Sequence, residues 1–273
     1  MHVRAVLAAH RPGYRVDSVV PAGAGLDNTV YEVNGELIVR FAREPDPARL
    51  DREVRLLALL AGISPLPVPQ PVLSVPELGC MAYPKLPGTP LLDVPPAHRP
   101  QIGAELGRFL AALHATPLPL VADLVEVDDP PLAALLAEAA ATFARIGVGL
   151  APDHRRAVEA FVSAPPPPGP DALVFSHHDL GIEHILVDGD RVTGVIDWSD
   201  AAIGDPAYAV GKLHRDLGVG GADPRVLFHA RCGLLEDLAY GLTTGRRAYV
   251  DKSLAALPRL FSDAGDNPVA GGV

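Results

Sequence analysis

Cysteine is almost absent from this sequence of 273 residues: only Cys80 and Cys232 occur, and both lie among apolar residues. Two such thiols are typical of buried free cysteines, so neither a disulfide framework nor a cysteine-ligated metal site is expected. Long apolar runs are also absent, because charge, proline or glycine interrupts each one before the roughly 20 residues that a membrane span requires. We therefore expect a protein that neither crosses nor binds a membrane.

Basic residues are in deficit, with 23 Lys and Arg against 33 Asp and Glu and a formal net charge of −10. No run or stripe of Lys and Arg occurs, so a nucleic-acid partner is not expected. The acidic balance is compatible with a cationic substrate and equally with a role in solubility alone. Residues 1–11 contain a short apolar stretch without the features of a secretion signal, so we expect a cytoplasmic protein.

The first 83 residues have the pattern of a small antiparallel sheet with one helix. Strand-like segments are expected at 14–20, 29–33, 36–41, 72–75 and 79–83. Asn34 and Gly35 form the favoured pair for a tight primed turn between the second and third of these segments. Apolar positions at helical spacing predict a helix over 46–60, whereas the prolines of 64–71 exclude a helix there.

The rest of the sequence is mainly helical in pattern. Helices are expected at 99–113, 132–146, 155–162 and within 208–260. Strand-like runs at 173–175 and 184–187 flank a polar loop, and a third such run follows over 191–196. The glycine-rich residues 263–273 are expected to form a disordered tail. A chain of this length suits one large domain or two lobes that share a cleft.

The polar loop is the strongest chemical signal. Residues 176–187 read Ser-His-His-Asp-Leu-Gly-Ile-Glu-His-Ile-Leu-Val, and Val-Ile-Asp-Trp follows at 195–198. Asp179 and Asp197 therefore each stand at the end of a strand-like run. Phosphoryl transfer needs such a pair, because one carboxylate positions the acceptor hydroxyl while another group holds Mg²⁺ against the phosphates.

These motifs, together with Gly-Asp-Pro-Ala at 204–207, resemble the signature set of the aminoglycoside phosphotransferases and related antibiotic kinases. The resemblance implies an α+β, protein-kinase-like fold with a nucleotide-binding lobe at 1–83. A helical lobe with the catalytic loop and the substrate site would occupy 84–262. It further implies transfer of the γ-phosphate of ATP or GTP, with Mg²⁺, to a hydroxyl of an antibiotic, most directly an aminoglycoside.

Four residues of the motifs take roles from this resemblance. Asp179 would be the catalytic acid that orients, and accepts a proton from, the substrate hydroxyl. Asp197 would bind Mg²⁺. His184 stands where relatives commonly have a metal-binding Asn, so it is assigned to the metal site, directly or through water, and macrolide phosphotransferases resemble this chain in having His there. His177 is expected to support the loop backbone.

The resemblance also implies a nucleotide site in the first lobe. Its residues would be Arg40, Glu53, Gly25, Asn28, Ala82 and Tyr83. Arg40 matches the kinase lysine that holds the α- and β-phosphates, with Glu53 as its ion-pair partner. The glycine-containing loop would cover the phosphates with backbone N–H groups, and the backbone of the last two residues would meet the purine. Pro84 lacks an N–H, so the choice between ATP and GTP stays open.

Ala209 departs from the family pattern, since relatives usually have an Asp there that braces the catalytic loop. Asp205 is expected to cap the helix that follows. Cation contacts in the second lobe, if not merely solvated acids, would come from Asp200, Asp216, Glu236 and Asp237.

Several functions stay open at this stage. The acceptor alternatives are a macrolide or a metabolite of choline, homoserine or sugar type, and a non-catalytic nucleotide-binding protein is a different class. The expected partners are a nucleoside triphosphate and a small molecule with a hydroxyl group. The expected assembly is a monomer or weak dimer.

Overall fold

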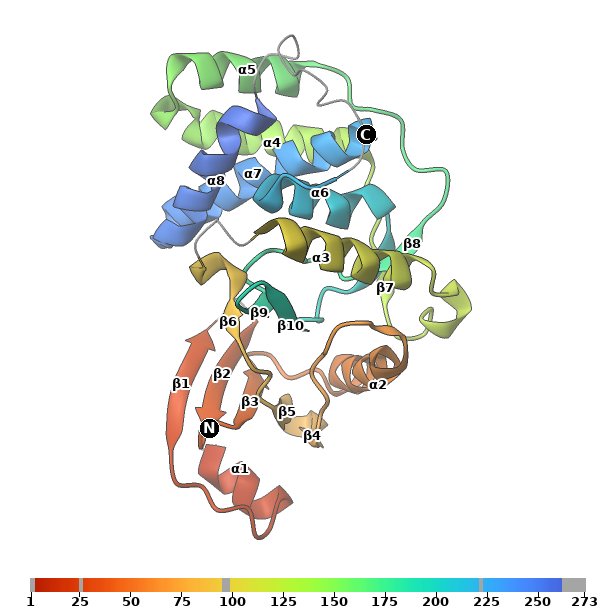
Figure 1. Cartoon of the computed structure of the whole chain (residues 1–273), viewed down its shortest axis with the longest axis vertical. Coiled ribbons are helices and arrows are strands. Elements are labelled where there is room, and N and C mark those ends of the chain that lie inside the picture. The colour runs from red at the N-terminus through yellow and green to blue at the C-terminus, as the bar shows by residue number, and fades with distance from the viewer. Residues whose placement is uncertain (1–2, 25–26, 95–98, 221–222, 262–273) are drawn as a thin grey trace.

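Five antiparallel strands form the sheet of the first lobe (Figure 1), in the spatial order β1-β2-β3-β5-β4. They span Val19–Ala24 (β1), Asn28–Val33 (β2), Leu37–Ala42 (β3), Leu73–Val75 (β4) and Cys80–Pro84 (β5). The computed structural model describes residues 3–24, 27–94, 99–220 and 223–261. Gly25 and the expected tail at 263–273 lie outside these described residues.

The turn between β2 and β3 is the predicted primed turn. Asn34 and Gly35 have φ angles of 55° and 76°, the left-handed values that such a turn requires. Because side chains alternate along a strand, the odd-numbered residues of β3 enter one core, whereas Arg40 points to the opposite face of the sheet.

The sequence pattern does not predict helix α1 (Val3–His10). Val6 and Leu7 of this helix pack on the sheet face opposite to Arg40 and are buried there. The helix has only eight residues, so its apolar face gives too short a periodic signal to distinguish it from a loop.

The strand expected at 14–20 is present with shifted bounds, because β1 begins at Val19 and ends at Ala24. The side-chain carbonyl of Asn34 accepts hydrogen bonds from the backbone N–H groups of Asp17 (2.8 Å) and Ser18 (3.0 Å). These donors are thus used by a side chain instead of by a neighbouring strand, which delays the start of pairing.

Helix α2 (Pro47–Ile63) confirms the helix predicted at 46–60. The carboxylate of Asp46 caps it by accepting from the N–H groups of Ala48 and Arg49, both at 3.0 Å. The apolar face of α2 consists of Leu50, Leu56, Leu57 and Leu60, which belong to the same core cluster as buried residues of the second lobe. The helix therefore joins the lobes physically.

The second lobe contains six α-helices in the part of the chain that the structure describes (Figure 1). They span Arg99–His114 (α3), Leu132–Ile146 (α4), Pro152–Ser163 (α5), Pro206–Leu217 (α6), Pro224–Thr244 (α7) and Arg247–Leu260 (α8). The helical stretch predicted within 208–260 is therefore three helices. Gly218 and Gly245, with φ near 70°, stand at the ends of α6 and α7.

Two small sheets position the two aspartate-containing motifs. Their strands are Thr89–Pro90 (β6), Glu126–Val127 (β7), Val174–Ser176 (β8), Ile185–Asp188 (β9), Arg191–Val195 (β10) and Ala202–Gly204 (β11), in the orders β10-β9-β6 and β7-β11-β8. The polar loop runs from β8 to β9, and Asp197 follows β10. The N–H of Ile196 donates to the carbonyl of His184 at 2.9 Å, which brings the two motifs together.

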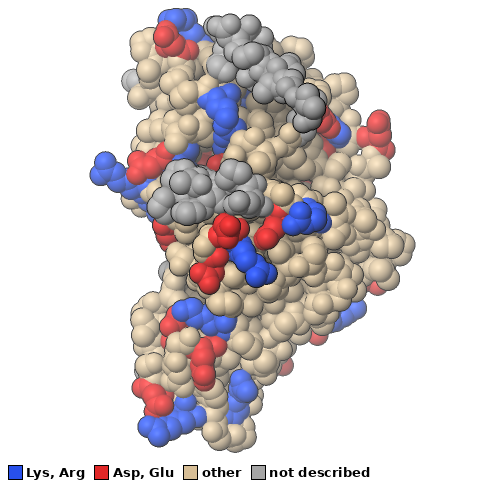
Figure 2. Space-filling model, viewed as in Figure 1, with Lys and Arg blue, Asp and Glu red and all other residues tan. Residues whose placement is uncertain are grey.

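The predicted α+β class, with a small sheet lobe and a mainly helical lobe, is confirmed. Strand β5 extends one residue past the expected boundary at 83/84, and that division itself stays a prediction. On the face shown in Figure 2, Lys and Arg residues are interspersed with Asp and Glu. None of the helices formed by the described residues is long and apolar enough to cross a membrane.

Candidate active site

Asp179 lies at the centre of the polar loop, between a cation and an imidazole. Its Oδ1 accepts a hydrogen bond from Lys212 Nζ at 2.7 Å, and its Oδ2 lies 3.3 Å from His184 Nδ1. Burial raises the pKa of Asp179, but Lys212 and His184 lower it more strongly, so the net shift is far downward. The carboxylate is therefore ionised and suited to orient a hydroxyl by accepting its hydrogen bond.

His177 contacts the backbone through both of its ring nitrogens. Its Nε2 donates to the carbonyl of Ile196 at 3.0 Å, and its Nδ1 accepts from the N–H of Asp179 at 3.2 Å. Burial lowers the pKa of His177 to about 4, so the ring is neutral. Because both ring nitrogens are engaged in backbone contacts, this residue supports the loop, in agreement with the sequence-based expectation.

Asp197 sits in the left-handed region, with φ of 63°. Ser199 Oγ donates to its Oδ1 at 3.0 Å, and its Oδ2 lies 3.7 Å from His184 Nε2. A non-glycine residue in this conformation is held by its surroundings, and such positions are common at functional sites. The structure thus brings Asp179, His184 and Asp197 into one cluster.

His184 is oriented for a cation. Its Nδ1 donates to the carbonyl of Asp179 at 2.9 Å, which leaves the lone pair of Nε2 on the side of Asp197 in the neutral ring. Burial lowers the pKa of His184, whereas Asp179, Asp197 and Glu183 raise it, and the net shift is upward. The same negative field favours a divalent cation, which would take the place of the Nε2 proton of the ring.

The protein donors fit a metal ion that nucleotide phosphates help to bind. Within the described residues, no group of three or more His, Cys, Asp or Glu side chains is arranged to hold a metal ion. Mg²⁺ usually takes one or two carboxylates and completes its shell with phosphate oxygens and water. Asp197 would be one protein contact, and the Nε2 atom of His184 would be the other, directly or through water.

Arg40 of β3 and Glu53 of α2 form a nearly buried ion pair in the first lobe. Burial lowers the pKa of Arg40, but Glu53, Tyr83 and Asp197 raise it, and the net shift is upward. Together with Asn28, the pair lines a cavity of about 510 Å³. The expected Arg40–Glu53 pairing is therefore present, and three of the residues assigned to the nucleotide share one cavity.

Ala82 and Tyr83 occupy different environments on β5. Ala82 is buried in the sheet, and its carbonyl accepts from the N–H of Val72 at 2.8 Å, so one of its lone pairs is already used. Tyr83 lies on the strand face that also carries Arg40, and burial raises the pKa of its phenol to about 12. A purine contact through Ala82 would have to share that carbonyl with the sheet.

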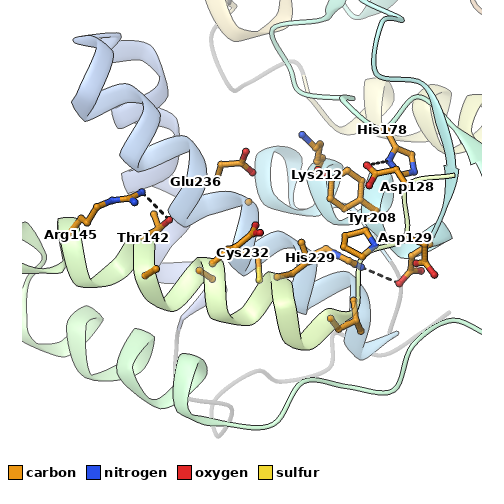
Figure 3. A pocket seen from close by; sticks show the side chains of 18 residues that line it. Asp128, Asp129, Thr142, Arg145, His178, Tyr208, Lys212, His229, Cys232 and Glu236 are labelled. Carbon is orange, nitrogen blue, oxygen red and sulfur yellow. Dashed lines mark hydrogen bonds and ion pairs between the residues drawn. The ribbon is translucent and has the colours of Figure 1, made fainter. Parts of the chain in front are cut away.

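Asp179 opens into a cavity of about 740 Å³ between α2 and the second lobe. A second cavity of about 560 Å³, seen in Figure 3, continues toward α4 and α7 and shares Asp128, His178, Tyr208, Lys212 and Glu236 with the first. Leu132, Leu135 and Ala139 give the second cavity an apolar wall, while Asp129 and Glu138 add acids. An acceptor reaching Asp179 would therefore meet both apolar surface and negative charge.

Two of the acids considered as cation contacts lie elsewhere. Asp216 accepts from Arg215 at 2.8 Å, and Asp237 pairs with Arg215 at 3.0 Å and with Lys252 at 2.9 Å, all in buried ion pairs. Lys252 also pairs with Glu183 of the polar loop at 2.9 Å. Asp216 and Asp237 therefore take part in the ion pairs that support the loop and do not line the 740 Å³ cavity, whereas Asp200 and Glu236 do.

Sequence reasoning missed Lys212. The one available signal was its position four residues after Tyr208, on the same face of the helix that begins at Pro206. Asp205 caps that helix as expected, since it accepts from the N–H of Ala207 at 2.8 Å. Ala209 is buried and carries no carboxylate that could brace the loop. The loop is instead contacted by Lys212, through Asp179, and by Lys252, through Glu183. The backbone N–H of Ile182 also donates to Oδ2 of Asp216 at 3.4 Å.

Comparison with known proteins gives a family match over residues 18–249, to the model described as the phosphotransferase enzyme family. A curated relative, hygromycin-B 4-O-kinase from Escherichia coli, is 41% identical over 44 residues, which cover 16% of this chain and 13% of that protein. The match to this curated relative therefore spans far less than two thirds of its length.

Solved structures match over nearly the whole chain. A macrolide 2'-phosphotransferase from Brachybacterium faecium is 29% identical, with a TM-score of 0.58 and coverage of 96% of this chain and 98% of that chain. The GDP complex of aminoglycoside 2'-phosphotransferase-IIIa is 21% identical, with a TM-score of 0.67 and coverage of 95% and 97%. The second likeness shows a shared fold.

Proposed function

Since the chain belongs to the phosphotransferase enzyme family, with an alcohol group as the acceptor, we propose that it moves the γ-phosphate of a nucleoside triphosphate to a hydroxyl of an antibiotic. The observation that carries the proposal is the Asp179–His184–Asp197 cluster, in which His184 lies 3.3 Å from one carboxylate and 3.7 Å from the other. Asp179 of this cluster lines the 740 Å³ cavity, which also reaches Glu53, the ion-pair partner of Arg40 in the first lobe.

In this proposal Asp179 accepts the hydrogen bond of the acceptor hydroxyl and aims its oxygen at the γ-phosphorus. The new bond joins that oxygen to phosphorus, the bond to the nucleoside diphosphate breaks, and the hydroxyl proton leaves through the Asp179 carboxylate to water. The downward pKa shift of Asp179 fits a loose transition state, in which orientation matters more than early proton removal.

The nucleotide would be held by residues of the first lobe and by the metal cluster. Arg40, fixed by Glu53, would neutralise the α- and β-phosphates. Mg²⁺, bound by Asp197 and His184, would neutralise charge on the β- and γ-phosphates. ATP and GTP are both compatible with this arrangement, and residues 1–83 would be the nucleotide-binding lobe.

Two antibiotic classes fit the acceptor cavities. The apolar wall of Leu132, Leu135 and Ala139 supports a macrolide, as does the 29% identity with the macrolide 2'-phosphotransferase over nearly the whole chain. An aminoglycoside is the second candidate, supported by the cavity acids Asp128, Asp129, Glu138 and Glu236. We favour the macrolide because it brings at most one positive charge toward the ammonium of Lys212, which already pairs with Asp179, whereas an aminoglycoside brings several.

A phosphate-transfer screen tests the proposal. The full chain, with Mg²⁺ and either ATP or GTP, is incubated with a macrolide, an aminoglycoside, choline, homoserine and a simple sugar, and products are identified by mass. Asp179→Asn serves as the blank. Transfer to an antibiotic supports the proposal, whereas transfer only to a small metabolite leaves the kinase chemistry and removes the antibiotic. Nucleotide binding without any transfer would favour the non-catalytic alternative.

A further inference from the structure

Lys212 of α6 is placed at the junction of the two acceptor cavities. Its ammonium donates to Asp179 Oδ1 at 2.7 Å and lies 5.3 Å from the centre of the Tyr208 ring. The side chain is only 14% exposed, yet it lines both the cavity at Asp179 and the cavity toward α4 and α7. Figure 3 shows Lys212 and Tyr208 on neighbouring turns of the same helix.

The charge of Lys212 is secured by its surroundings. Burial and the nearby Arg215 lower its pKa, whereas Tyr208 and Asp179 raise it, and the net shift is far upward. An ammonium has three donors, and one of them is used by Asp179. The group thus stays cationic at the position where a substrate ammonium would otherwise pair with the catalytic carboxylate.

We propose that Lys212 is a positioning and specificity-determining residue of the transfer reaction. Its ammonium fixes the orientation of the Asp179 carboxylate and disfavours acceptors that bring several positive charges into the two cavities. A charge-assisted bond of 2.7 Å to one oxygen restricts rotation of the carboxylate, and small errors in the placement of reacting groups are costly in rate. The inference rests on the proposed function, because it assumes that Asp179 orients the acceptor.

The contacts of Lys252 show why Lys212 is not merely a structural cation. Both lysines pair with acids of the catalytic loop, but Lys252 pairs with Glu183, Asp216 and Asp237 behind the loop and lines neither acceptor cavity. Lys212 contacts the reacting carboxylate itself and faces the acceptor. A positioning role therefore predicts an effect on turnover and on acceptor charge preference, which a purely structural cation would not produce.

The experiment compares Lys212→Met and Lys212→Arg with the wild-type full chain. For the acceptor found in the screen, we expect Lys212→Met to lower kcat about 10- to 100-fold while KM for the nucleotide stays within about twofold. Lys212→Arg should recover a large part of kcat, since it restores the cation. The matched control is Lys85→Met, which removes an exposed ammonium–carboxylate pair of the same length, 2.7 Å to Glu32.

A second measurement does not depend on turnover. The affinity of a polycationic aminoglycoside, measured by calorimetry without nucleotide, should rise about 3- to 30-fold in Lys212→Met and remain unchanged in Lys85→Met. If no acceptor is phosphorylated by the wild type, the proposed function fails and the positioning role fails with it, and this binding measurement then decides only whether the ammonium of Lys212 repels cationic ligands. Thermal unfolding of each variant shows whether it is folded.

Two results would overturn the inference. One is a Lys212→Met variant, folded by thermal unfolding, whose kcat lies within twofold of the wild type. The other is an aminoglycoside affinity of Lys212→Met that equals or falls below that of the wild type, because removal of a repelling ammonium should raise this affinity.

Discussion

The imidazole of His177 lies against the indole of Trp198, with ring centroids 4.5 Å apart. His177 precedes Asp179 by two residues, and Trp198 directly follows Asp197. This buried contact, together with the hydrogen bond from His177 to Ile196, holds the two proposed catalytic carboxylates at a fixed separation.

Asp179→Asn should lower kcat about 10²–10⁴-fold, because the amide cannot accept the hydroxyl proton and competes poorly for its hydrogen bond. Nucleotide affinity should be unchanged, since the residue faces the acceptor. Steady-state kinetics and calorimetric titration check both parts. Turnover close to that of the wild type would remove Asp179 from the catalytic role.

Asp197→Ala should abolish productive binding of the Mg²⁺-nucleotide, because the change removes the one carboxylate assigned to the metal. The nucleotide without Mg²⁺ should bind the variant and the wild type with similar affinity. Isothermal titration with and without Mg²⁺ tests the difference. Equal Mg²⁺-nucleotide affinities in the two proteins would contradict the assignment.

The Arg40–Glu53 pair should contribute to both stability and nucleotide binding. Arg40→Met or Glu53→Met alone leaves a buried charge without its partner and should lower the free energy of unfolding by about 3–5 kcal/mol. The double variant should be less destabilised than the sum of the two changes. The double variant should bind nucleotide more weakly than the wild type, because it lacks the Arg40 guanidinium. Denaturant unfolding and titration measure the two effects, and a fully additive double variant would show that the pair is not coupled.

His177 should make the protein sensitive to acid. Its pKa falls from the ordinary 6.5 to about 4 on folding, so the unfolded chain binds more protons between these values. Stability is therefore fully present above pH 6.5 and is lost progressively toward pH 4, by on the order of 3 kcal/mol.

The comparison for this effect is His177→Gln, which carries no titrating group. Its free energy of unfolding should fall less between pH 7 and pH 4.5 than that of the wild type. His154→Gln on α5 is the control. Parallel pH profiles for His177→Gln and the wild type would disprove the prediction.

The salt dependence of the acceptor KM should distinguish a macrolide from an aminoglycoside. A macrolide carries at most one basic amino sugar on a large apolar ring, so its KM should change by less than about twofold between low and high ionic strength. The KM of a polycationic aminoglycoside should rise several-fold, because salt screens each exposed ion pair. A steep salt dependence for the preferred acceptor would favour the aminoglycoside alternative.

The sequence was most informative where local chemistry decides the structure. The turn at Asn34 and Gly35 follows from residue preference alone, and the proximity of Asp179 to Asp197 follows from two motifs that close short strand connections. The contact of Lys212 with Asp179 was not predictable, because helical periodicity does not say which loop a helix face meets. Asp237 read as a solvated acid because its partner Arg215 lies on another helix.

Leucines of α2 and buried residues of α3 belong to one continuous apolar cluster. The expected division at 83/84 therefore separates two functions without separating two folding units. A fragment ending there would expose the apolar stripe of α2, whereas the intact chain should melt in a single cooperative calorimetric transition. Opening and closing of the cleft would then be limited to motions that keep α2 seated on the helical lobe.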